Sequence, residues 1–314
     1  MKQFFNEYGG VAIIVIVIAV LLLLVGSVKS LDETTGKVNG SGVASMVGNK
    51  FSESINKFQK SFMAVDAAKG PNGEPVISKD ESQVGKYADV DGDGTVDGII
   101  FADLMVGGSG TWNDYDTSVS WANAQGSYTI PTVTSTKDYY VSQESYTNKL
   151  GETAEVLSPT GSGNDRFYIM ALSGIDSNRH DWYHNAVSGK MSDYASTTNQ
   201  DFGKGKSNTA TMISKWNSKA YGDQNTCSIH TDLWGEIQTQ VNNGWFVPSR
   251  QELAAFAGQL GITKSNYSSK GLSDWCWSSS QYGANSAYIA NFSDVHIYGI
   301  PVDNGTYVRL AATF

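Results

Sequence analysis

Residues 89–100, with the sequence DVDGDGTVDGII, have the residue types and the spacing of a calcium-binding loop. Such loops place oxygen ligands at positions 1, 3, 5, 7 and 9, where position 7 contributes a backbone carbonyl. Carboxylates on alternate residues can converge on one hard cation, which offsets their mutual repulsion. We therefore expect a structural calcium ion here, and the alternative is an acidic turn that holds no metal. The expected ligands are Asp89, Asp91, Asp93, Thr95 and Asp97.

The residues around this loop argue against a helical calcium sensor. A helical EF-hand needs a bidentate glutamate at position 12, where this chain has Ile100, and a helix on each side of the loop. Here the flanking sequences VGKYADV and GIIFADLM are rich in residues that favour strands. The sequence therefore predicts a calcium loop between two strands, which is similar to the calcium loops of FG-GAP repeats.

No sequence pattern indicates catalysis. The chain lacks a glycine-rich phosphate loop and a G-x-S-x-G nucleophile elbow. Of its two cysteines, Cys276 lies between two tryptophans, a setting typical of core packing, and Cys227 lies in the polar stretch DQNTCS. We expect a buried free thiol or one disulfide of an exported protein rather than a redox pair. The protein is therefore not expected to be an enzyme.

Polar and aromatic residues alternate with apolar ones between positions 282 and 307. Tyrosine gives a binding surface broad, rigid contacts, and asparagine, serine and aspartate give adaptable hydrogen bonds. The alternation therefore predicts a ligand-binding surface, and the alternative is the ordinary polar face of a β-hairpin. We call the candidate ligand-binding residues the display set: Tyr282, Asn285, Ser286, Tyr288, Asn291, Ser293, Asp294, His296, Tyr298, Asp303, Asn304 and Thr306.

The elements that would carry these residues are both helical and extended. Apolar spacing predicts helices over residues 207–219 and 232–241, and a capping box of Ser249 and Glu252 predicts a third that ends near Gly261. Residues 128–133 and 166–172 have the composition of strands, and residues 275–314 alternate short apolar runs with polar turns. The sequence thus predicts an α+β fold.

Three motifs carry a resemblance to a known family. GWFVPSRQEL, WSSSQY and the closing YVRLAATF resemble the C-terminal domain of collagen-like bacterial adhesins, which has the formylglycine-generating-enzyme type of C-type lectin-like fold. Within that group, the chain is most similar to variable proteins of diversity-generating retroelements in gut bacteria. The resemblance implies a C-type lectin-like ectodomain over residues 80–314, with a variable, ligand-binding segment at about 275–314. It also implies an adhesin or receptor whose ligand is a protein or glycan on another cell or surface.

The N-terminus predicts a membrane anchor. Residues 9–28, GGVAIIVIVIAVLLLLVGSV, carry no charge and are long enough for a helix to cross a bilayer. We expect residues 1–28 to form a single-pass transmembrane helix, with the C-terminal domain extracellular. Residues 29–79 would then be a stalk, in which apolar spacing predicts an amphipathic helix over residues 43–63.

The same N-terminal pattern leaves a structural alternative open. A hydrophobic helix followed by an amphipathic one resembles small pilins, so the chain would be a pilin-like or pilus-tip subunit that carries the lectin-like domain. In that case the N-terminal helix would assemble into a pilus or a homo-oligomer. Nucleic acid is not an expected partner, because the net charge is -9 and no cluster of basic residues is present.

Overall fold

The computed structural model describes residues 28–31, 38–40, 69–113, 125–226 and 229–314. The chain divides into two units, Met1–Ala67 and Ala68–Phe314. The predicted membrane span, apart from Val28, and the stalk helix expected over residues 43–63 lie outside the described residues. In the first unit, β1 (Val28–Leu31) pairs antiparallel with β2 (Val38–Gly40). None of the helices that the structure describes is sufficiently long and apolar to span a bilayer.

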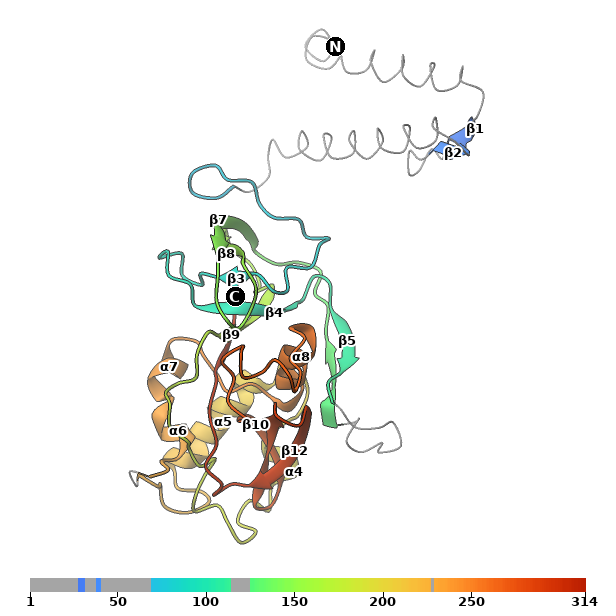
Figure 1. The fold of residues 1–314 in the computed structure, drawn as a ribbon. Helices are drawn as coiled ribbons and strands as arrows, with labels where there is room; N and C mark the ends of the chain where they lie inside the picture. The colour runs from blue at the N-terminus through green and yellow to red at the C-terminus, as the bar shows by residue number, and fades with distance from the viewer. Residues whose placement is uncertain (1–27, 32–37, 41–68, 114–124, 227–228) are drawn as a thin grey trace. The chain divides into compact units, whose positions relative to one another are not determined.

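The second unit is α+β, as expected, with more strand than helix (Figure 1). Its strands are β3 (Tyr87–Ala88), β4 (Gly98–Asp103), β5 (Gly108–Thr111), β6 (Ser127–Ile130), β7 (Asp138–Tyr146), β8 (Ala154–Thr160), β9 (Phe167–Ala171), β10 (Trp275–Gly283), β11 (Ser286–Asn291), β12 (His296–Pro301) and β13 (Ala311–Thr313). Its helices are α4 (Tyr194–Thr197), α5 (Gly205–Asn217), α6 (Leu233–Glu236), α7 (Gln238–Asn242) and α8 (Arg250–Gln259). The predicted strands near residues 128–133 and 166–172 are confirmed as β6 and β9.

A six-stranded sheet joins the beginning and the end of this unit. The strand order is β13-β9-β4-β3-β8-β7, and β3 and β8 run parallel while the other pairs are antiparallel. All of β4 is buried, because its successive side chains enter cores on opposite faces of the sheet. Ile99 and Phe101 pack with Phe256 of α8, whereas Ile100 packs with Tyr139 on the other face.

A second sheet of three antiparallel strands, in the order β10-β11-β12, carries most of the display set. Its central strand β11 is covered on both faces. Ala287 and Ile289 pack in one core cluster with Trp277, and Tyr288 and Ala290 pack in another. This sheet is therefore not half-exposed, and its exposed residues lie near the ends of β10 and β12, in the turns and in the segment after β12.

The helices follow the sequence pattern closely, with one break. The predicted capping box at the start of α8 is confirmed, because Ser249 Oγ accepts a hydrogen bond from the Glu252 N–H and Glu252 Oε2 accepts one from the Ser249 N–H. The single helix expected over residues 232–241 is instead two short helices, α6 and α7, which meet at Ile237. Gly235 contributes to this break, since glycine is a poor helix former, and a Cβ at this position would collide with the Trp216 ring.

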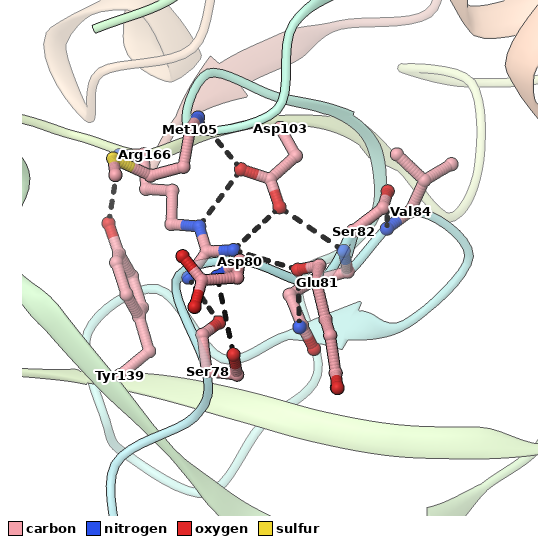
Figure 2. A network of polar contacts seen from close by, with 10 residues as sticks. Ser78, Asp80, Glu81, Ser82, Val84, Asp103, Met105, Tyr139 and Arg166 are labelled. Carbon is pink, nitrogen blue, oxygen red and sulfur yellow. Dashed lines mark hydrogen bonds and ion pairs between the residues drawn. The ribbon is translucent and has the colours of Figure 1, made fainter. Parts of the chain in front are cut away.

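A buried ion pair fastens the start of the unit to the large sheet (Figure 2). The Arg166 guanidinium donates to both carboxylate oxygens of Asp103, at 2.9 and 2.8 Å, and to the carbonyls of Ser78 and Glu81. The Ile77 N–H also donates to a strand carbonyl of β7. Residues 69–79, which the sequence placed in the stalk, therefore belong to the packed unit that begins at Ala68.

Candidate functional site

The acidic loop lies in the hairpin between β3 and β4, as predicted from its flanking sequences. Asp89 is buried and organises the turn, because its carboxylate accepts hydrogen bonds from the N–H groups of Gly92, Asp93 and Gly94 and from Ser158 Oγ. Gly92 and Gly94 have φ values of 75° and 90°, a backbone conformation that favours glycine. The loop is therefore held in shape by its own first aspartate.

Three of the predicted calcium ligands come together in this loop. Ligand oxygens of Asp89, Asp91 and Asp97 lie within 4.8 Å of one another. Asp93 is not part of that cluster, and its carboxylate instead accepts the N–H of Thr95 at 2.7 Å. Burial raises the pKa of Asp97, and the neighbouring carboxylates raise it further against the hydrogen bond from the Val90 N–H. An all-oxygen donor set with this mutual repulsion is chemically suited to calcium.

Calcium is expected to stabilise the folded protein. At a calcium concentration about 100 times the dissociation constant, binding adds roughly 2.7 kcal/mol, which raises Tm by roughly 5–10 °C in a unit of this size. The change Asp91→Ala should abolish that rise, because it removes an exposed carboxylate from the cluster. The measurement is thermal unfolding of the full chain in calcium and in chelator, with Asp223→Ala as a matched exposed control. Identical Tm values with and without calcium would show that the loop is an ordinary acidic turn that holds no metal.

The display set divides by exposure. Residues that are exposed or partly exposed lie at the facing ends of β10 and β11, in the turns, on β12 or in the segment after it: Tyr282, Asn285, Ser286, Ser293, Asp294, Tyr298, Asp303 and Asn304. Four members are buried: Tyr288, Asn291, His296 and Thr306. Sequence alternation placed all of them on one outward surface, whereas the second face of β11 is covered by the core cluster that includes Phe256.

The exposed members gather at two opposite ends of the three-stranded sheet. At the first, which we call the 285/303 end, the Val302 N–H donates to the Asn285 carbonyl and joins the β10–β11 turn to the segment after β12. Tyr282 is 47% exposed here, and its ring packs edge-on against Tyr288 at a centroid distance of 5.1 Å. At the second, the 294 end, the β11–β12 turn presents Asp294. One ligand therefore cannot contact the whole display set at once, because its exposed members lie at opposite ends of the sheet.

The buried members hold these turns in shape. Asn291 Oδ1 accepts hydrogen bonds from Ser293 Oγ and from the Asp294 N–H, which closes the β11–β12 turn. The His296 ring stacks on Tyr298 at a centroid distance of 4.6 Å and an interplanar angle of 22°. These side chains support the turns rather than presenting a surface of their own.

Within β10, the WSSSQY motif contributes three serines that have no solvent exposure and form a buried polar layer. Ser280 Oγ donates to the Asn199 carbonyl, and Ser279 Oγ accepts from Asn208 Nδ2. Asn199 and Asn208 had no recognisable signal in the sequence, since they lie some 70–80 residues from the serines that they bind. This layer fixes β10 against α5 and so gives the 285/303 end a rigid base.

Comparison with known proteins adds no family to this description. No protein-family model, curated protein or solved structure matches the chain. The C-type lectin-like fold therefore stays a prediction, and the site is defined by its own residues.

A histidine cluster flanks the 285/303 end and was not predicted as part of it. The buried Asp181 accepts a hydrogen bond from His184 Nδ1 at 2.6 Å, and its other oxygen lies 3.5 Å from Nδ1 of His230. His230 covers Gly305, where a Cβ would overlap its ring. Burial raises the pKa of Asp181, which the hydrogen bond from His184 opposes. The sequence could not reveal this cluster, because His230 is brought to Asp181 by the tertiary fold.

Cys276 is a buried free thiol, which is one of the two outcomes expected for it. Burial raises the pKa of its thiol to about 11, so the reactive thiolate is scarce at neutral pH. Cys227 lies outside the described residues.

Proposed function

We propose that this chain is a membrane-anchored, surface-displayed ligand-binding protein of the adhesin or receptor type. The observation that carries the proposal is the contrast at the 285/303 end. Tyr282, Asn285, Asp303 and Asn304 are exposed there, while the strands between them are buried and tied to a hydrogen-bonded serine layer. Exposed tyrosine and asparagine on a rigid base are the features by which a paratope gains contact at low entropic cost.

The proposed fold is the C-type lectin-like fold of the family that the motifs resemble. Three placements support it. The first and last strands of the unit, β3 and β13, share one sheet. The PSRQEL stretch begins α8 through a capping box, and the closing YVRLAATF ends in β13. The resemblance to diversified proteins implies in addition that exposed positions of residues 275–314 vary, whereas Ser278, Ser279 and Ser280 stay fixed.

The anchor and the compartment follow from the sequence of residues 9–28, whose uncharged apolar run fits a bilayer-spanning helix. The proposed orientation exports the α+β unit, where its ligand is a protein or glycan on another cell or surface. Calcium has a structural role in this proposal, because the acidic loop joins β3 to β4 of the large sheet, whereas the display set is centred on the other sheet.

Paired libraries of the full chain test the proposal. The display library randomises Tyr282, Asn285, Ser286, Asp303 and Asn304, and the scaffold library randomises Ser278, Ser279, Ser280, Ala287 and Ile289. Because exposed substitutions usually change stability by less than about 0.5 kcal/mol, most display variants should fold and resist protease. Most scaffold variants should be degraded, since they place new volume or unpaired polar groups in the core. Equal survival of the two libraries would contradict the division into surface and base.

Diversification is tested at the gene. We expect a near-copy of the codons for residues 275–314 beside a reverse transcriptase gene. If neither the near-copy nor the reverse transcriptase gene lies beside this gene, the binding surface is fixed and the retroelement part of the proposal is wrong.

A further inference from the structure

Among the residues that the structure describes, Arg309 is a buried cation without a buried counter-ion. Its side chain is 8% exposed, and its guanidinium donates to the carbonyls of Ala171 (2.7 Å) and Gly271 (3.1 Å). Within the part of the chain that the structure describes, no carboxylate lies within ion-pair distance of it. Two carbonyls engage only part of the five-donor guanidinium, so hydrogen-bonding capacity remains.

Arg309 lines a pocket of about 340 Å³. The walls are the loop after β9 (residues 172–177), the loop before β10 together with the start of that strand (residues 271–276), and residues 307–309. Lys149, which is exposed, crosses Gly271 so closely that a Cβ there would overlap it. No member of the display set lines this pocket, so it is a different site from the one proposed above.

The charge of the pocket is opposite to that of the chain. Its lining includes Lys149 and Arg309 and a single carboxylate, Asp176, although the net charge of the chain is -9. That carboxylate is already engaged by His180 Nε2 at 3.0 Å and by Asn178 Nδ2 at 3.1 Å. The pocket therefore offers an unpaired buried cation to any anion that enters.

The energetics favour such an anion. A buried charge is costly unless it is paired, and here burial lowers the pKa of Arg309, which reflects that cost. A carboxylate that accepted the remaining guanidinium donors would supply the missing charge in the bidentate geometry that arginine prefers.

The remaining lining narrows the class of ligand. Trp275 and Tyr307 offer aromatic surface, and Ser173, Ser177 and Ser273 offer hydroxyl groups. The volume lies at the lower end of the range for small-molecule sites. We propose that this pocket binds an acidic monosaccharide through the Arg309 guanidinium, with the sugar hydroxyls on the serine side chains and the sugar ring on the aromatic wall.

A carboxylate fits the site better than a phosphate. A phosphate monoester carries close to two negative charges at neutral pH, whereas the pocket supplies one buried cation and one exposed lysine. The anionic Asp176 on the same wall would repel a doubly charged phosphate more strongly than a singly charged carboxylate. A singly charged carboxylate is balanced by Arg309 alone.

The test uses the full chain and three probes of similar size: glucuronate, glucose and glucose 6-phosphate. Isothermal titration or saturation-transfer NMR should detect glucuronate with a dissociation constant on the order of 1 mM, as expected for a ligand of this size. Glucose and glucose 6-phosphate should bind at least about 10-fold more weakly. Equal affinity for glucuronate and glucose, or tighter binding of the phosphate, would overturn the proposal.

Variants at other positions show whether glucuronate binds in this pocket. Arg309 itself is not replaced, because its replacement would also remove two hydrogen bonds from the fold. Ser273→Trp should fill the pocket and abolish glucuronate binding, and Lys149→Ala should weaken it about 3-fold. The exposed Lys206→Ala is the matched control and should leave it unchanged. Glucuronate binding that survives Ser273→Trp would place the ligand elsewhere. The display-library variants should retain glucuronate binding, so a failure here and a failure of the proposed function are distinguishable.

Discussion

The change Asp103→Ala is expected to lower the free energy of unfolding of the unit Ala68–Phe314 by about 3–5 kcal/mol. The Asp103 carboxylate accepts from Arg166 through both oxygens and also from the N–H groups of Gln83 and Met105. Both side chains of the ion pair are 1% exposed. Alanine would therefore leave a buried guanidinium without its counter-ion, and it would remove the acceptor of the buried Gln83 N–H and of the partly buried Met105 N–H.

Urea unfolding followed by tryptophan fluorescence measures this loss. The milder Asp103→Asn keeps the shape and one acceptor oxygen, so it should cost roughly 1–3 kcal/mol and remain measurable if the alanine variant does not fold. The control is Asp138→Ala, which breaks the partly exposed pair with Lys79 and should cost less than about 1 kcal/mol. Equal losses for Asp103→Ala and Asp138→Ala would show that the buried pair does not fasten residues 78–84 to the sheet.

The second large effect is a pH dependence that originates at Glu252. This carboxylate is fully buried and accepts hydrogen bonds from the N–H groups of Ser249, Gly203 and Gly205, but no cation faces it among the described residues. Burial raises its pKa to about 7, against the opposing effect of these hydrogen bonds. In the unfolded chain the pKa is about 4.3. The folded state therefore binds the proton more tightly than the unfolded state does.

The sign follows from proton linkage. Because the folded pKa is the higher one, Glu252 contributes its full stabilisation below about pH 4.3, and that contribution is lost as pH rises through about 7. The full loss should amount to roughly 3–4 kcal/mol, of which roughly 2–3 kcal/mol falls between pH 5 and pH 8. Glu252→Gln should remove this part of the pH dependence, although the amide leaves one N–H of the capping box without an acceptor.

Urea titrations between pH 5 and pH 8 compare the slope of stability against pH for the wild-type chain, Glu252→Gln and the exposed control Glu144→Gln. Only Glu252→Gln should flatten the slope. A wild-type slope that Glu252→Gln leaves unchanged would mean that Glu252 is charged throughout this range and that its hydrogen bonds outweigh its burial.

Local signals in the sequence predicted local structure well. The capping box of Ser249 and Glu252, the strands on both sides of the acidic loop and the burial of Cys276 depend on residues close together in the chain, and all are confirmed. The display set was harder to predict. A period of two residues shows that side chains alternate, but it cannot show that Tyr288 faces a second core cluster.

Long-range pairs had no signal at all. Asp103 and Arg166 are 63 residues apart, and the carbonyls that hold Arg309 lie 138 and 38 residues from it. One sequence does not report which distant charges meet in the core, so neither the buried ion pair nor the pocket at Arg309 could be foreseen. Both depend on the topology that brings β9, the loop before β10 and the C-terminal segment together.

The most direct test of the central claim is the yield of binders from the display library when it is selected against a protein target that the wild-type chain does not bind, such as lysozyme. The matched comparison is a library at exposed positions of β7 and the residue next to it: Ser142, Gln143, Glu144, Ser145 and Thr147. The account predicts folded binders from the display library, at least about 10-fold more often than from the β7 library, with binding lost when position 282 is changed to alanine. Equal yields from the two libraries would contradict the claim that the 285/303 end is a dedicated ligand-binding surface.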